Sequence, residues 1–266
     1  MVATYEVFAI RYAHLERTAR HNFLGGDEHD GPMPLDYYVW AIVNTERTII
    51  VDTGFDQDSA RRRGRQIVRP VAEGLKSIGL SPDKIEHIVI SHMHYDHAGN
   101  HDLFPSARYH LQDAEMAYCT GRCMLDAEVG GVFDAGAVAA MTHKVFEGRV
   151  QFHDGDDEIA PGITVHKVGG HTRGMQIVRV STARGWVVLG SDTAHFYANL
   201  EPGRPFPIFD DLSAYVQAQR TALQLASSPQ HFIPGHDPLV LARYPSARAG
   251  LEGVARVDLP PGVEHD

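Results

Sequence analysis

The residues best suited to chemistry lie in one short segment, His92-Met93-His94-Tyr95-Asp96-His97. It places three imidazoles and one carboxylate within six positions. In an extended or looped backbone, residues two positions apart point the same way, so His92 and His94 can hold one metal ion. Asp96 and His97 then turn toward a second. Imidazole nitrogens with carboxylate oxygens suit zinc best, with manganese, iron or cobalt as alternatives. A solvated polar loop is the competing interpretation.

Three later positions offer the further ligands that a dinuclear site needs. Each follows an apolar stretch that we predict to be a strand. Each is also closely preceded by glycine, which allows close backbone packing around an ion. The three candidates are His171 after Ile163–Val168, Asp192 after Trp186–Leu189 and His236 after His231–Ile233. Any one of them alone is a weak signal, but with the first segment they form a set of seven candidate ligands.

Strands must position these residues, because binding sites are usually built on loops that a rigid sheet holds at its strand ends. The apolar runs predict strands over Thr4–Ala13, Tyr37–Asn44, Arg47–Asp52, Ile85–Ile90, Val150–His153, Ile163–Val168, Gln176–Ser181, Trp186–Leu189 and His231–Ile233. We expect helices over Gln66–Ile78, within Asp113–Lys144 and over Leu212–Ala226, and an irregular tail after Tyr244. Two sets of strands separated by helices suggest two sheets with helices outside, in a single domain over residues 1–266.

Composition narrows the partners and the location. The chain has 266 residues and a formal net charge of −10. An acidic chain has no general attraction for phosphate backbones or anionic lipid, so we expect neither a nucleic-acid nor a membrane partner. The run Arg61-Arg62-Arg63-Gly64-Arg65 is interpreted as a solvated turn or helix end. No signal peptide is visible, and Cys119 and Cys123, expected on one helix face, are interpreted as reduced thiols; a cytoplasmic protein is therefore expected.

Taken together, the motifs resemble those of the metallo-β-lactamase superfamily. The pattern is H-x-H-x-D-H, then a distant G-H-T, then S-D after a strand, then P-G-H. The resemblance covers about residues 35 to 240 and implies an α/β protein with the αββα sandwich. It also implies that Asp52, in the early D-T-G turn, supports the site without binding metal. The implied ligands of one ion are His92, His94 and His171, and those of the second are Asp96, His97 and His236, with Asp192 bridging the two.

Within that superfamily the chain is most similar to N-acyl-homoserine lactonases and related hydrolases of small lactones. The similarity rests on its size, on the stretch Gly31–Pro34 and on the interval from Asp192 to His236. Two departures stand out. Those lactonases carry a tyrosine three residues after the bridging aspartate, where this chain has His195, with Tyr197 two positions further on. The interval between His97 and His171 is also longer than usual.

The resemblance implies that the protein hydrolyses a small lactone, of the N-acyl-homoserine lactone type, by attack of a hydroxide that bridges two metal ions. Asp96 and Asp192 would orient the nucleophile. His195 would stabilise the oxyanion or protonate the product, because imidazoles titrate near neutrality; a surface histidine is the alternative interpretation. Two divalent ions, zinc first, are the expected cofactors, and the expected partner is a small-molecule substrate. A homodimer is an open alternative for the assembly.

Other activities use the same ligand set. Glyoxalase II-like thioesterases and hydrolases of other cyclic esters or amides remain alternatives, whereas a nuclease should show a basic surface that this chain lacks. A non-catalytic metal-binding protein of the same fold is a further alternative. The complete ligand set argues against it, because a structural zinc site needs only four closed ligands.

Several other residues are candidates for the lining of a substrate pocket. Tyr95 is expected to form a pocket wall, and Met33 and Phe206 are candidates for an apolar lining. The remaining histidines are expected to be surface or ordinary packed residues: His14, His21, His29, His87, His101, His110, His143, His153, His166, His231 and His265.

Overall fold

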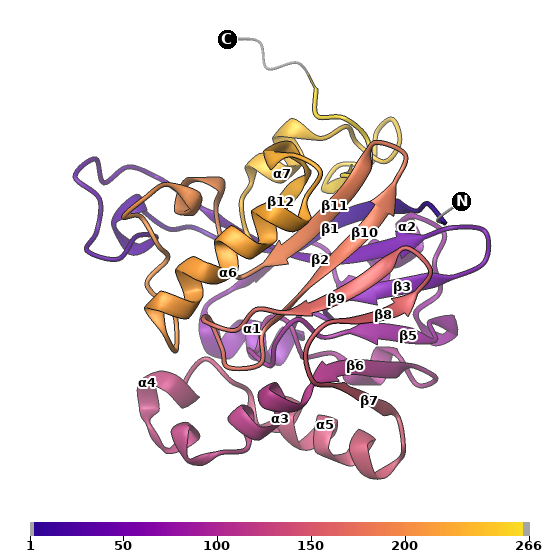
Figure 1. Cartoon of the computed structure of the whole chain (residues 1–266), viewed down its shortest axis with the longest axis horizontal. Coiled ribbons are helices and arrows are strands. Elements are labelled where there is room, and N and C mark those ends of the chain that lie inside the picture. Colours follow the sequence, from indigo (N-terminus) through magenta and orange to yellow (C-terminus); the bar gives the residue numbers. More distant parts are fainter. Residues whose placement is uncertain (1–2, 263–266) are drawn as a thin grey trace.

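The chain folds into two β-sheets packed face to face, with helices on their outer faces (Figure 1). The computed structural model describes residues 3–262. The larger sheet has eight strands in the order β13-β1-β2-β3-β5-β6-β7, with β4 paired to β1. These strands are β1 Glu6–Leu15, β2 Leu35–Val43, β3 Thr48–Val51, β4 Gln66–Ile67, β5 His87–Val89, β6 Arg108–Gln112, β7 Val150–His153 and β13 Val254–Arg256.

The smaller sheet has five strands in the order β12-β11-β10-β9-β8. Strands β8 to β11 pair antiparallel, and β12 pairs parallel to β11. This arrangement, a sheet on a sheet with helices outside, is the predicted αββα sandwich. The five strands are β8 Asp157–Ala160, β9 Ile163–Lys167, β10 Gln176–Thr182, β11 Gly185–Ser191 and β12 Phe232–Pro234.

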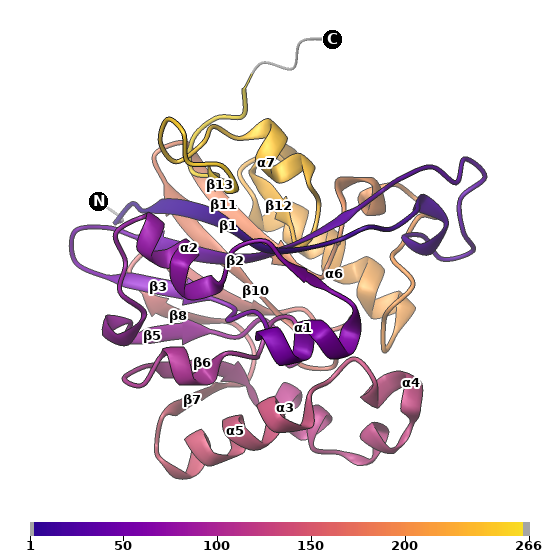
Figure 2. The ribbon, with the colours of Figure 1, turned by 180° about the vertical axis from the view of Figure 1, so that it is seen from behind.

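Helices cover both sheets from outside. Helix α6 lies over the smaller sheet, α7 lies at the edge of the sandwich beside β12 and β13, and the view from behind shows α1 and α2 over the larger sheet (Figures 1 and 2). Helices α3, α4 and α5 gather beyond the edge strand β7. Among residues 3–262, no helix is both long and apolar enough to cross a membrane. The α-helices are α1 Gln57–Arg63, α2 Val71–Ser77, α3 Asp113–Cys119, α4 Ala127–Gly130, α5 Ala135–Phe146, α6 Leu212–Leu225 and α7 Leu239–Arg243.

Strands β1 and β2 are buried on both faces, which explains their nearly continuous apolar sequences. Successive side chains of a strand point to opposite faces. Val7 and Ala9 of β1 therefore pack between the sheets, beside the fully buried Trp40. Phe8 and Ile10 pack on the other face, in the core that includes residues of α1 and α2.

The ends of four strands meet at one edge of the sandwich. Strand β5 leads to His92, β9 to the loop of His171, β11 to Asp192 and β12 to His236. Gln176, at the start of β10, joins the two sheets there: its backbone N–H donates to Ser91 O at 2.9 Å and its side-chain amide donates to Ile90 O at 2.8 Å. The fold thus brings segments that are distant in sequence to the same edge.

The predicted helix Gln66–Ile78 is wrong over its first part. Gln66–Ile67 forms strand β4 against β1, and α2 begins only at Val71, with Pro70 at its N-cap. Proline fixes φ and has no N–H, so it is tolerated at a helix start and not inside a helix. The segment Asp113–Lys144 holds α3, a 3₁₀ turn, α4 and the greater part of α5, in agreement with the helices expected within it.

The tail after Tyr244 is not irregular throughout. Strand β13 pairs antiparallel with β1, and Val254, Ala255 and Val257 are buried. The two cysteines do not share a helix face either: α3 ends at Cys119, and Cys123 lies in the 3₁₀ turn that follows. Both cysteines are free thiols, as expected.

Three of the remaining histidines form a hydrogen-bonded row across adjacent strands. His87 Nδ1 lies 3.1 Å from His110 Nε2, and His110 Nδ1 lies 3.0 Å from His153 Nε2. His153 Nδ1 ends the row 2.8 Å from Asp157 Oδ2. Burial lowers the pKa of His110 to about 3, so its ring is neutral and can accept one hydrogen bond while it donates another. The row therefore ties β5, β6 and β7 together.

Candidate metal centre

The metal-binding segment is anchored by the aspartate of the D-T-G turn. Asp52 has a φ of 63°, a left-handed conformation that aspartate tolerates better than most residues. Its carboxylate accepts hydrogen bonds from the Ser91 N–H at 2.7 Å and from the Ser91 hydroxyl at 2.8 Å. His97 Nδ1 lies 2.7 Å from the same carboxylate. Asp52 therefore fixes the start and the end of the segment without facing the centre itself.

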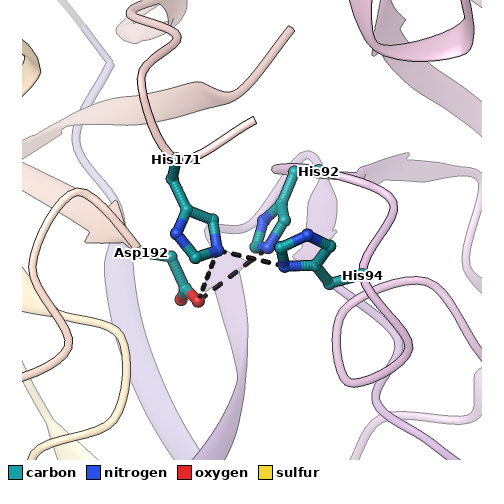
Figure 3. Close-up of side chains that lie close together, drawn as sticks. All are labelled: His92, His94, His171 and Asp192. Carbon is teal, nitrogen blue, oxygen red and sulfur yellow. Dashed lines mark hydrogen bonds and ion pairs between the residues drawn. The ribbon is translucent and has the colours of Figure 1, made fainter. Parts of the chain in front are cut away.

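Four buried side chains converge on one point (Figure 3). His171 Nε2 lies 3.0 Å from His94 Nδ1 and 3.2 Å from Asp192 Oδ2. His92 Nε2 lies 3.8 Å from Asp192 Oδ2. Ligand atoms of all four residues lie within 4.8 Å of one another, a spacing that can surround a single ion.

A second group lies on the other side of Asp192. Asp96, His97 and His236 have ligand atoms within 4.8 Å of one another. His236 Nε2 lies 3.0 Å from Asp192 Oδ1, and His97 Nε2 lies 3.3 Å from that oxygen. Asp192 therefore turns Oδ2 toward the first group and Oδ1 toward the second. The structure brings all seven predicted ligands together in the arrangement that the resemblance implies.

The unpaired atoms of the centre fit metal ions. His92 Nε2, His97 Nε2 and Asp192 Oδ1 are buried and have no hydrogen-bond partner. Buried polar atoms are almost always partnered, so such a group of lone pairs points to a cation. Nitrogen and carboxylate oxygen donors of this kind suit zinc.

The tautomers of the imidazoles are fixed by the atoms behind them. His171 Nδ1 donates to Ile208 O at 2.8 Å, and His236 Nδ1 donates to Asp36 O at 2.9 Å. His92 Nδ1 lies 3.1 Å from the Ser91 hydroxyl oxygen, which can accept its proton. With His97 held by Asp52, four of the five rings direct Nε2 toward the centre, and the unprotonated form of that nitrogen can bind metal.

Burial and neighbouring charges also shift the pKa values of the ligands. Burial lowers the pKa of His92 and His94 well below the ordinary value, so both rings are neutral. Burial alone would raise the pKa of Asp192, but the surrounding imidazoles outweigh it and hold that pKa well below the ordinary value. Asp192 is therefore ionised and can share its two oxygens between two cations.

Glycines next to the ligands are required by close packing, as the sequence suggested. A Cβ at Gly235 would lie 2.8 Å from Asp192 Oδ1, within the centre itself. A Cβ at Gly170 would clash with the backbone of Tyr215, and the φ of Gly170 is 87°. Any side chain at either position would displace the ligand that follows it, His236 or His171.

His195 lies in the centre and not on the surface. Its Nε2 is 3.0 Å from Asp192 Oδ2, and its ring stacks on Phe206 with centroids 3.4 Å apart. Burial lowers the pKa of His195 to about 3 although Asp192 opposes the shift, so the ring is neutral at neutral pH. The expectation that this imidazole titrates near neutrality therefore needs correction. Tyr197 does not take its place, because its ring packs under the Arg243 guanidinium, 4.4 Å away.

A narrow cavity of about 90 Å³ opens over the ligands. Tyr95 and Phe206 form parts of its wall, as predicted from the sequence. Met33 does not line it; this residue is half-buried and packs against the core. Arg17, Arg63 and Arg65 also line the cavity, so the run Arg61–Arg65 is not wholly a solvated helix end.

Glu115 is a supporting residue that the sequence analysis missed. This fully buried side chain comes from α3. It accepts hydrogen bonds from Met93 N–H at 2.8 Å, from the Thr172 hydroxyl at 2.6 Å and from Gly174 N–H at 3.0 Å. It therefore ties the loop of His92 and His94 to the loop of His171. An acidic residue in a helix usually faces solvent, so only its burial shows this role.

We expect Glu115→Gln to destabilise the protein by about 2 kcal/mol, because an amide NH₂ would face donors that the carboxylate now satisfies. Zinc should also bind more weakly, since two ligand loops lose their common anchor. Thermal unfolding and metal titration measure both effects. Asp113→Asn, an exposed change on the same helix, is the matched control. Equal stability and equal zinc affinity in the two variants would contradict this role of Glu115.

Comparison with known proteins agrees with this geometry. The family model described as Metallo-beta-lactamase superfamily matches residues 33–236. N-acyl homoserine lactonase AiiA of Bacillus thuringiensis subsp. kurstaki is 26% identical over 218 residues, which cover 76% of this chain and 82% of the relative. N-acyl homoserine lactonase AiiB of Agrobacterium fabrum is 28% identical over 228 residues, which cover 77% and 80%.

Solved structures share the fold. A quorum-quenching N-acyl homoserine lactone lactonase superposes with a TM-score of 0.74 at 21% identity, covering 90% of this chain and 95% of that one. AidC, described as a dizinc quorum-quenching lactonase, gives a TM-score of 0.69 at 17% identity, with coverages of 90% and 89%. The family match spans most of the chain and includes all seven residues of the centre. This protein therefore belongs to the metallo-β-lactamase superfamily.

Proposed function

We propose that this protein is a metal-dependent hydrolase that opens a small lactone of the N-acyl-homoserine lactone class. The observation that carries the proposal is the buried Asp192 carboxylate, which lies between two groups of metal-binding side chains. The names of the relatives support the substrate class. Enzymes of that substrate class remove signalling lactones, so quorum quenching is the role that we assign.

The proposed ligands are those that converge in the structure. His92, His94 and His171 would hold one divalent ion, and Asp96, His97 and His236 the other, with Asp192 shared. Zinc is the ion that we propose, and manganese, iron and cobalt fit the same donors less well. Such ions supply a nucleophile at neutral pH by lowering the pKa of water, and they polarise a carbonyl oxygen.

The chain's own residues would orient and enclose the reactants. The carboxylates of Asp96 and Asp192 can accept hydrogen bonds from the attacking water and so aim it at the lactone carbonyl. Tyr95 and Phe206 narrow the cavity and limit the bulk water around the reacting atoms. Asp52 and Glu115 keep the ligand loops from moving as the lactone ring opens.

We also propose a role for His195, which replaces the tyrosine of related lactonases. Its ring is neutral and buried, and Nε2 can donate to Asp192 Oδ2. Its Nδ1 is buried and has no partner. The ring therefore has one nitrogen to position the shared carboxylate and one that can interact with the substrate or with the product hydroxyl.

We also propose a location in the cytoplasm. The acidic composition and the two free thiols support a cytoplasmic protein. A homodimer remains an open alternative for the assembly.

Hydrolysis assays on a panel of lactones, thioesters and cyclic amides test the proposed activity. With zinc-loaded protein we expect turnover of lactones. We expect Asp192→Asn to lower kcat/KM by at least about a hundredfold, because both metal groups lose their shared ligand. Asp58→Asn, an exposed change on α1, is the control. Turnover of thioesters or cyclic amides without lactones would replace the proposed substrate class, and full lactone activity in Asp192→Asn would refute the proposed centre.

His195→Phe should lower kcat by at least about tenfold and leave the metal content intact, because it removes a hydrogen-bonding group but no assigned ligand. His195→Tyr, which restores the residue of related lactonases, should recover part of the lost kcat. Steady-state kinetics with metal analysis of the same samples gives both quantities. Unchanged kinetics in His195→Phe would show that the ring only fills space, and a loss of metal would make it a ligand.

A further inference from the structure

Three arginines line the cavity over the metal centre: Arg17, Arg63 and Arg65. Their number is unexpected in a chain with a net charge of −10. Each side chain is half-buried. Among residues 3–262, none of the three forms an ion pair with a carboxylate, although most of the other partly buried arginines either form such a pair or donate to carbonyl oxygens. A basic wall thus stands beside the metal site.

The three arginines are held in different ways. Arg63 donates to the carbonyl oxygens of Gly131 at 2.8 Å and Phe133 at 2.9 Å, and its guanidinium lies 4.0 Å from the centroid of the Tyr95 ring. Its two terminal nitrogens are therefore already used to anchor the segment that carries Phe133. Arg63 adds positive charge to the cavity but has little capacity to bind a further group.

Arg65 and Arg17 keep donors free. Arg65 Nε donates to the Tyr95 hydroxyl at 3.0 Å and Nη1 donates to Arg63 O at 2.6 Å, so Nη2 is left over. Arg17 donates through Nη2 to His21 O, while its Nε is buried and has no hydrogen-bond partner. The Arg17 guanidinium also lies 5.3 Å from the centroid of the Phe206 ring, the ring that stacks on His195.

These two guanidinium groups repel each other. Burial lowers the pKa of Arg17, and the nearby positive charge of Arg65 lowers it as well. Keeping two like charges together, half-buried and with unused donors, destabilises the protein unless a counter-charge enters between them. Burial would lower the pKa of Arg65, but Tyr95, Tyr37 and Asp96 together raise it. Asp96 and Asp192, the carboxylates that line the cavity, are assigned to the metals and form no ion pair with either arginine, which leaves the unused donors to a ligand. Arginine is well suited to this task because its planar donors match a carboxylate.

We propose that Arg17 and Arg65 bind a carboxylate carried by the substrate, so that the lactones hydrolysed best are compact and anionic. This inference rests on the proposed lactonase function and requires a substrate that, unlike an uncharged N-acyl-homoserine lactone, carries a carboxylate on the lactone. In the reaction, water adds across the acyl C–O bond of the ring, which gives a hydroxyl group and a second carboxylate with release of one proton. The cavity of about 90 Å³ agrees with a compact substrate, because pockets for larger ligands usually enclose about 300 Å³ or more.

A matched pair of lactones tests the proposal: 5-oxotetrahydrofuran-2-carboxylate and its neutral carboxamide, which share ring and size. Zinc-loaded wild-type protein should prefer the carboxylate. The ratio of kcat/KM for the anionic over the neutral lactone should fall by about tenfold or more in Arg65→Gln and in Arg17→Gln. In Arg65→Lys, which keeps the positive charge but lacks the planar pair of donors, this ratio should fall less. Because two arginines are replaced separately, the misfolding of one variant would not leave the proposal untested.

Arg62→Gln is the control, since Arg62 is exposed on α1, pairs with Asp134 and does not line the cavity over the centre. Its ratio should equal that of the wild type. Equal turnover of the two lactones by the wild type, or a ratio that neither Arg17→Gln nor Arg65→Gln changes, would overturn the anionic substrate and leave the lactonase activity standing.

Binding separates this inference from the activity on which it rests. If neither lactone is hydrolysed, the proposed function fails, and calorimetric titration with 2-hydroxyglutarate, the open-chain product, still measures the arginine site. Binding at least about tenfold weaker in Arg65→Gln than in Arg62→Gln would support an anion site beside the metals. Equal binding by the two variants would overturn it.

Discussion

The buried carboxylate of Asp192 is the group around which the side chains of the centre are arranged. Asp192 is almost inaccessible to solvent, yet imidazoles approach both of its oxygens from two directions. A carboxylate in such a place is costly unless strong partners neutralise it. The rings alone leave donor atoms unused, since His92 Nε2 and His97 Nε2 have no hydrogen-bond partner. Cations held by the two groups of side chains would satisfy both the carboxylate and the rings.

The rest of the fold serves to keep these donors in place. Each of the two groups takes ligands from strand ends of both sheets, so the packing of one sheet on the other sets the distances among the ligands within a group. Gln176 joins the sheets at that edge, Asp52 fixes one ligand loop, and Glu115 ties it to the loop of His171. Each of these side chains is buried and hydrogen-bonded to backbone or ligand. Apart from Asp52, which belongs to the D-T-G turn, these supporting residues lie outside any recognisable motif.

The sequence predicts the features that depend on local residue patterns and misses those that depend on contacts between distant segments. The seven ligands are recognisable because chemistry demands their residue types and because each follows an apolar strand. The roles of Glu115, Arg17 and Arg65 depend on contacts between segments far apart in the chain, and a charged residue in a helix or turn carries no local sign of burial. The same limit explains β13, whose strand conformation comes from pairing with β1. The predicted helix Gln66–Ile78 fails at its start because it includes Pro70, whose missing N–H is tolerated only at the beginning of a helix.

Counting the tightly bound metal ions tests the account most directly. The protein is stripped of metal, reconstituted with zinc and dialysed exhaustively. Elemental mass spectrometry then gives the number of zinc ions per chain. The arrangement of the donors about Asp192 predicts about two zinc ions per chain. One ion per chain, or none, would contradict the claim that Asp192 is shared between two cations.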